Sequence, residues 1–234
     1  MIGNILGEES LTSNRFAGFI AEIFMFEGRL NRPAARLLST YLWVKYGIKG
    51  KDNFWDVFHG NMLTPGGAAW GGKYYEPIGI GNETSGVNGG SINEARSHGL
   101  VLRPNGNWQT TSYLCAAPVG SSPTGLPSNQ VIDTEIQFPV LQRWKRVWEI
   151  AGNNQGNEQE YQIAFDFGEG IGGSIPQNPE NFVLLYRDHP TSGIFSILDV
   201  PNENKSVIDD EIVFRLPKND LTTYGRYYTV GTID

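Results

Sequence analysis

The feature that most constrains the fold is a series of short apolar runs in the second half of the chain, each bounded by turn-forming residues. The runs are rich in β-branched and aromatic side chains and lie at 142–151, 160–167, 181–187, 194–198, 211–216 and 224–232. No segment with helical periodicity separates them, and short strands in close succession are typical of antiparallel sandwiches. The sequence therefore predicts a mainly β chain, an antiparallel β-sandwich of the jelly-roll or immunoglobulin-like kind.

The first half of the chain has fewer strand signals and longer loops. Three further strands are expected at 78–81, 99–104 and 108–115, separated by stretches rich in Gly, Asn and Ser. The chain has 29 Gly and 13 Pro among 234 residues. This share exceeds the usual level of about 12% and suits a fold with many turns.

One helix is expected, at 32–46. Asn31 is a suitable N-cap and Pro33 suits the first turn. Apolar side chains recur at spacings of three and four, as in an amphipathic helix; they are Ala34, Leu37, Leu38, Tyr41 and Leu42. We expect this helix to pack on the sandwich and to end near Tyr46, before Gly47.

The segment before the helix is apolar in both of its alternating sets. One set is Phe16, Ile20, Phe24 and Phe26, and the other is Phe19, Ala21, Ile23 and Met25. A strand of this kind needs burial on both faces, so it must pair within its own domain or with a neighbouring chain. The sequence thus suggests an assembly strand, donated to a neighbour, whose candidate residues are Phe16, Phe19, Ile20, Ile23 and Phe24.

Composition narrows the class of protein. The net charge is −7 and the 18 Lys and Arg form no evident basic patch, so a nucleic-acid partner is not expected. No stretch reaches the roughly 18 apolar residues of a membrane span, so membrane insertion is not expected either. Cys115 is the one cysteine, which excludes an internal disulfide, and its apolar surroundings favour a small buried residue of a strand.

Several motifs resemble one family of bacterial surface proteins. YLWVKYGI (41–48) is similar to the sequence that closes laminin G-like, concanavalin A-like domains in large surface proteins of gliding, type IX-secreting bacteria, and FAGFIAEIFMFEGRL (16–30) resembles the last strand of those domains. The later segments PIGIGNETSG, RWKRVWEI, YQIAFDF, NFVLLYRD and YYTVGT are similar, in that order, to the β-sandwich domain of unknown function that often follows.

The resemblance implies two parts and an extracellular location. Residues 1–50 would be the last strand and helix of a concanavalin A-like domain, and 51–234 would be the β-sandwich domain. Only fifteen residues precede Phe16, far fewer than a complete concanavalin A-like domain needs. We therefore expect either a piece of a larger surface protein or a free-standing relative, such as a virion or fibre subunit.

The sequence motifs for catalysis are incomplete. GEGIGG (168–173) fits a dinucleotide-binding glycine pattern, but Pro176 and Pro179 prevent the helix that must follow it. The three histidines, His59, His98 and His189, are too scattered for a metal motif. The carboxylates considered for glycoside hydrolysis, Glu22, Asp166 and Glu169, lack the paired spacing that such an enzyme needs, and Arg29 or Arg36 could neutralise Glu22. No enzyme activity is expected.

Two groups of residues suggest binding. The aromatic side chains Trp55, Phe58, Trp70, Tyr74 and Tyr75 lie in glycine-containing loops. They would either pack locally or stack on a sugar or a partner protein. Trp144 and Trp148, four residues apart in one run, are expected on one face of a strand in the core. No cofactor is expected, but calcium stays open, because loops 151–160 and 201–211 offer Asp, Asn and backbone oxygens.

The function that the resemblance implies is a non-enzymatic structural or adhesive module of an extracellular surface protein or fibre. Its expected contacts are self-association, a neighbouring surface or virion protein, and glycans. Two alternatives stay open: a carbohydrate-binding module whose ligand-binding residues are Trp55, Trp70, Tyr74 and Tyr75, and a phage virion protein that decorates a capsid or forms a fibre.

Overall fold

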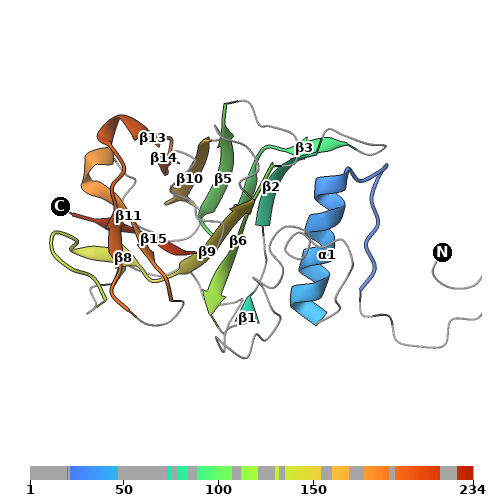
Figure 1. Cartoon of the computed structure of the whole chain (residues 1–234), viewed down its shortest axis with the longest axis horizontal. Helices are drawn as coiled ribbons and strands as arrows, with labels where there is room; N and C mark the ends of the chain where they lie inside the picture. Colours follow the sequence, from blue (N-terminus) through green and yellow to red (C-terminus); the bar gives the residue numbers. More distant parts are fainter. Residues whose placement is uncertain are drawn as a thin grey trace, which may run out of the picture. The chain divides into compact units, whose positions relative to one another are not determined.

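The computed structural model describes residues 20, 22–46, 73–74, 78–83, 89–106, 112–120, 130–131, 135–153, 160–168, 177–189, 193–216 and 226–233. Within them the chain is mainly β, with two antiparallel sheets and the helix α1 (Arg32–Tyr46) (Figure 1). The predicted antiparallel β-sandwich with one helix is confirmed.

The larger sheet, sheet A, runs in the order β12 (Ser196–Leu198), β11 (Phe182–Arg187), β15 (Arg226–Thr232), β9 (Val147–Asn153), β6 (Ser112–Gly120), β2 (Ile78–Glu83) and β3 (Gly90–Ile92). Three short strands pair beside this path: β1 (Lys73–Tyr74) with β6, β8 (Gln142–Trp144) with β15, and β7 (Gln130–Val131) with β8.

The smaller sheet, sheet B, runs in the order β13 (Lys205–Ile208), β14 (Glu211–Leu216), β10 (Glu160–Asp166), β5 (Leu100–Asn105) and β4 (Ala95–Ser97). All described strand pairs in both sheets are antiparallel; they include β6 with β9 and β10 with β14. Two short 3₁₀ turns, η2 (Pro179–Asn181) and η3 (Asn202–Asn204), precede β11 and β13.

Aromatic side chains from both sheets fill the core. Trp144 and Trp148 come from sheet A and are almost fully buried, which confirms their predicted place. Phe165 of sheet B meets them edge-on, with ring centroids 5.5 and 5.7 Å away, and lies 6.1 Å from Phe214 on the next strand. The core is therefore a continuous aromatic cluster that joins the sheets.

The run expected as one strand at 142–151 is two strands, β8 and β9. The backbone leaves the ladder at Lys145 and Arg146, and the hydroxyl of Thr229 on β15 bonds to the carbonyl oxygens of Trp144 (3.0 Å) and Arg146 (2.9 Å). A side-chain donor thus replaces ladder hydrogen bonds at the break. The strand expected at 108–115 is β6, which begins at Ser112 and continues to Gly120.

The loop 201–211, considered for calcium, contains a hairpin. β13 and β14 pair across Asp209 and Asp210, and Asp209 has a φ of 54°. Asp tolerates the left-handed region better than most residues, so it suits a tight turn. Most of the other calcium loop, 154–159, lies outside the described residues.

The predicted helix is confirmed at both ends as α1. The side chain of Asn31 accepts a hydrogen bond from the Ala34 N–H at 2.9 Å, as expected of an N-cap. Contacts divide the chain into two compact units, Met1–Leu30 and Asn31–Asp234. The helix thus belongs to the unit that contains the sheets, whereas the division expected from sequence lies after it, at residue 50.

The apolar segment before the helix differs from its prediction. Residues 20 and 22–26 form no strand, and exposed fractions reach 61% for Ile23 and 91% for Met25. The described apolar side chains are therefore not buried within the single chain, and burial against a neighbouring chain stays a prediction. Phe24 and Phe26 stack, with ring centroids 6.3 Å apart, so they share one side of the segment. Phe16 and Phe19 lie outside the described residues.

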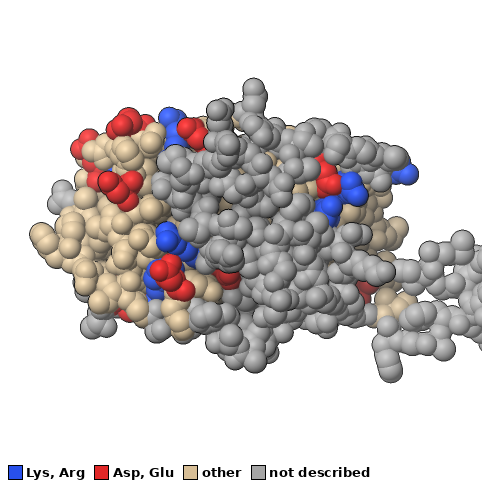
Figure 2. Space-filling model, viewed as in Figure 1, with Lys and Arg blue, Asp and Glu red and all other residues tan. Residues whose placement is uncertain are grey.

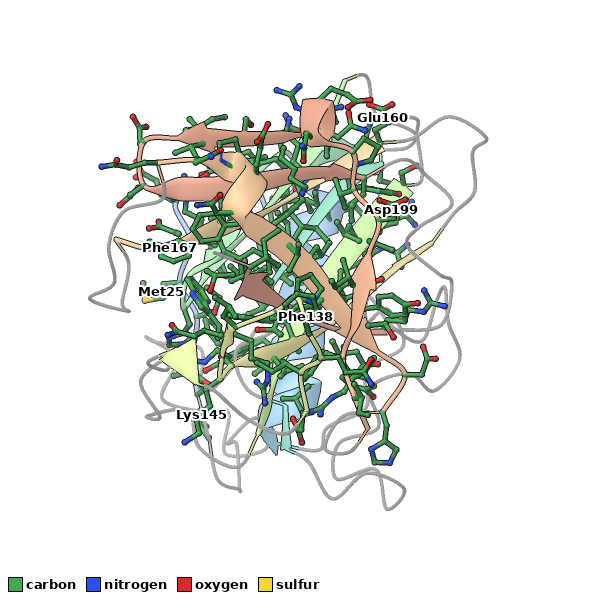
Figure 3. All side chains as sticks on the ribbon, turned by 90° about the vertical axis from the view of Figure 1, so that its left-hand side faces the viewer. Met25, Phe138, Lys145, Glu160, Phe167 and Asp199 are labelled. Atoms are coloured by element: carbon green, nitrogen blue, oxygen red, sulfur yellow. The ribbon has the colours of Figure 1, made fainter. Side chains whose placement is uncertain are left out.

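We expect Phe165→Ala to lower the free energy of unfolding by about 3–5 kcal/mol, because it leaves a cavity among aromatic rings from both sheets. The measurement is urea denaturation followed by tryptophan fluorescence. Phe138→Ala is the matched control, because this ring, labelled in Figure 3, is 92% exposed, so its removal should change the free energy of unfolding by less than about 0.5 kcal/mol. Equal losses would contradict the assigned core.

Candidate functional site

The outward face of sheet B carries a cluster of charged side chains, which we call the charged face: Glu94, Arg96, Arg103, Asp166 and Glu211. Alternation along the strands places them there, because Leu100 and Leu102 of β5 enter the core while Arg103 faces the other way. Asp166 of β10 is directly opposite Glu211 of β14. Two like charges at this spacing need cations beside them.

Two arginines supply those cations. Arg103 binds Glu211 through two hydrogen bonds, Nη1–Oε2 at 2.6 Å and Nη2–Oε1 at 2.9 Å. Arg96 reaches Glu211 Oε1 at 2.9 Å and Asp166 Oδ2 at 3.3 Å. Glu94 accepts from the Nε of both arginines at 2.7 Å. The charged face is therefore a connected network of acids and bases.

The Arg103–Glu211 pair crosses β10 diagonally. Arg103 is opposite Gln162, and Glu211 is opposite Asp166. Ala164 lies between these two β10 positions on the same face, with Val101 and Val213 beside it. All three apolar side chains are fully buried, and the ion pair joins the two strands on either side of β10.

The ion pairs of the charged face shift the pKa values of Glu94, Arg96 and Arg103. Hydrogen bonds from Arg96 and Arg103 lower the pKa of Glu94. A hydrogen bond to Glu94 raises the pKa of Arg96, and one to Glu211 raises that of Arg103. The exposed Glu94 and Arg96 let the face offer hydrogen bonds to a polar ligand.

A second cluster docks the helix on sheet A. Glu83 of β2 is buried and pairs with Arg36 Nε at 3.1 Å and with Arg32 Nη1 at 2.7 Å, both from α1. Tyr113 of β6 donates its hydroxyl to the same carboxylate. The Tyr113 ring lies over Gly81, where an added Cβ would be 2.4 Å from it. Glycine is thus required at position 81, because a side chain there would clash with the Tyr113 ring.

The electrostatics of this cluster favour the charged form of Glu83. Burial raises the pKa of Glu83, but hydrogen bonds from Tyr113 and Arg36 outweigh burial and hold the pKa below its usual 4.5. Burial and the bond to Glu83 raise the pKa of the Tyr113 phenol. Arg36, expected as one of two partners for Glu22, pairs with Glu83.

A third cluster lies at the β11 and β12 end of sheet A. Glu135 accepts from Arg143 Nη2 at 2.8 Å and from Arg187 Nη1 at 2.9 Å. Both guanidinium groups lie on the ring of Phe195, 4.8 and 4.3 Å from its centroid. The Phe195 N–H donates to the Glu135 carbonyl oxygen at 2.8 Å. This cation–π arrangement fixes the segment that leads into β12.

On the face in view in Figure 2, basic side chains of the described residues lie next to acidic ones at several places, whereas at the upper left acidic side chains lie among uncharged residues.

The predicted binding aromatics mostly fall outside the structural description. Trp55, Phe58, Trp70 and Tyr75 lie outside the described residues, and Tyr74 is described only as part of the backbone of β1. Their role in binding stays a prediction. Of the predicted assembly residues, Ile20, Ile23 and Phe24 are exposed, at 50%, 61% and 37%.

The other candidates from sequence do not form a described site. Cys115 is buried in β6, where burial raises the pKa of its thiol. Asp166 binds Arg96 and accepts the Gly168 N–H at 2.9 Å, while Glu169 and the rest of the glycine-rich segment lie outside the described residues. His98 occupies the turn between β4 and β5 with a φ of 50°, His189 follows β11, and His59 is not described.

Within the part of the chain that the structure describes, three or more His, Cys, Asp or Glu side chains do not gather where a metal ion could bind. A search of the same residues for a helix long and apolar enough to cross a membrane found none. Three comparisons, with protein-family models, curated proteins and solved structures, gave no match.

The two arginines on Glu83 allow a matched test of helix docking. Arg36→Met should lower the free energy of unfolding by about 3 kcal/mol, because the Arg36 side chain is 9% exposed and its loss leaves a buried charge. Arg32→Met should cost under about 1 kcal/mol, because that side chain is 53% exposed. Urea denaturation at pH 7 measures both; equal costs would contradict the buried role of Arg36.

Acid should destabilise the protein through Glu83. The folded pKa of Glu83 is below its usual 4.5, so its pairs contribute stability above pH 4.5 that is lost as pH falls through the folded pKa. Urea denaturation from pH 7 to pH 3 should show this fall. Glu83→Gln should remove only part of this loss of stability, because the pKa of Glu94 is lowered as well. Exposed Glu203→Gln is the control, and an unchanged slope for Glu83→Gln would count against the assignment.

Proposed function

We propose that the chain is a non-enzymatic structural or adhesive module of an extracellular surface protein or fibre, and that it acts through contacts with proteins and glycans. The observation that carries this proposal is the exposure of the apolar side chains at residues 20 and 23–26, on a chain whose sheet-containing unit has an aromatic core and arginine–carboxylate pairs. Such a segment is costly in water unless a partner covers it.

The charge pairs support a role as a rigid frame. The buried carboxylates of Glu83, Asp166 and Glu211 each bind at least one arginine. A carboxylate held by an arginine in this way contributes to the shape of the face. The frame would present its loops at fixed positions.

The carbohydrate-binding alternative has one observation in its favour. On the charged face, Glu94 and Arg96 keep exposed side-chain fractions of 46% and 38%, so they can reach a ligand. Guanidinium and carboxylate groups bind sugar hydroxyls through paired hydrogen bonds, and the loop aromatics Trp55, Trp70, Tyr74 and Tyr75 would add stacking. A virion location is the alternative to the cell surface.

Beads coated with the full chain test the proposal. We expect them to cluster or to bind a glycan array saturably, and the soluble protein to release no reducing sugar from a polysaccharide panel. Arg96→Ala should weaken glycan binding if the charged face is used, with exposed Lys145→Ala as the control. Sugar release that Asp166→Asn or Glu211→Gln abolishes would overturn the proposal in favour of a glycoside hydrolase.

A further inference from the structure

Four strands lie at the ends of the two sheets, and their edges differ in how they are protected against pairing with another chain. A free strand edge invites pairing with another chain, and proteins block it with charge or a covering element. β13 carries Lys205 and β4 carries Arg96. β3 is covered by α1, whose cap residue Asn31 donates to the Ser91 carbonyl oxygen at 3.4 Å. β12, with the sequence Ser-Ile-Leu, has no charged residue.

Two apolar side chains at β12 face water. Ile197 lies in β12, opposite Leu185 of β11, and is 40% exposed. Ile194, just before the strand, is 51% exposed. The Phe195–Glu135 backbone hydrogen bond holds the residue between Ile194 and β12. We call this uncharged strand with its exposed side chains Ile194 and Ile197 the β12 edge.

The same chain carries an exposed apolar segment of matching chemistry. Residues 20–26 read IAEIFMF, and the described apolar side chains among them are exposed. Phe24 and Phe26 stack on one side, as side chains two residues apart do in an extended chain. The segment belongs to the compact unit 1–30, apart from the unit that contains the sheets. Donor and acceptor surfaces thus lie on separate units of one chain.

We propose that the β12 edge of one copy binds residues 20–26 of a second copy as an added strand of sheet A. This inference rests on the proposed function and names the partner for it. Backbone hydrogen bonds would extend the sheet, and the apolar side chains of the segment would cover Ile194 and Ile197. Seven residues are enough to span the three of β12 and its flanks.

The contact is heterologous, because the segment and the edge are different surfaces. Each copy can give its segment to one neighbour and accept the segment of another. Such a contact generates a ring if the rotation closes and a fibre if it does not. For a structural protein, this contact therefore defines how further copies add to a ring or fibre.

Two lysine variants of the full chain test the proposal. Ile197→Lys places a charge on the β12 edge, and Ile23→Lys places one in the segment. Light scattering coupled to size exclusion, at increasing concentration, should show oligomers for the unmodified chain and monomers for each variant. An equimolar mixture of the two variants should give a one-to-one dimer that grows no further, because it retains one intact segment and one intact edge.

Ile208→Lys is the matched control, because Ile208 is 46% exposed on β13 at the edge of the other sheet. It should assemble like the unmodified chain. Thermal unfolding of each variant should stay unchanged, since the substituted side chains are exposed. A monomeric unmodified chain, oligomers that survive Ile197→Lys, or a mixture that stays monomeric would overturn the inference. If the chain is monomeric but beads coated with it still cluster or bind glycans, the assembly inference fails and the proposed function stands.

Discussion

The arrangement of the sheet-containing unit depends on the buried pair between Glu83 and Arg36. Glu83 is 4% exposed, and a carboxylate at that depth requires a cation and hydrogen bonds around it. Arg36 and Tyr113 supply them, so α1 is fixed on the face of sheet A and its cap covers β3. One end of sheet A is closed by this contact, which leaves β12 at its other end.

The same chemistry recurs on sheet B and next to β12. Arginines reach across strands to carboxylates on the charged face, and Arg143 and Arg187 enclose Phe195 beside Glu135. These arginines hold carboxylates in place on different faces of the sheet-containing unit. The exposed large apolar side chains of the described surface include those at the β12 edge and at residues 20 and 23–26. The proposed assembly brings these two surfaces together.

Sequence predicts this fold well where the signal is local. The helix 32–46 and the strand 211–216 follow from spacing and flanking turns, and both are confirmed. Local patterns cannot predict the break in the strand at Lys145, because the hydrogen bond that stabilises it joins Trp144 to Thr229, which lies 85 residues away in the sequence. The Arg36–Glu83 and Arg103–Glu211 pairs are equally remote, at 47 and 108 residues. For the apolar segment, the pattern of apolar residues predicts that the segment needs burial, but it does not predict which molecule buries it.

Disulfide cross-linking between two differently substituted chains tests the central claim most directly. One chain carries Ile23→Cys and the other Ile197→Cys, and Cys115 stays out of the reaction because it is buried with a raised thiol pKa. The account predicts a disulfide-linked dimer in the mixture, and none when Ile208→Cys replaces Ile197→Cys. Absence of the cross-link, or an equal yield with Ile208→Cys, would contradict assembly through the β12 edge.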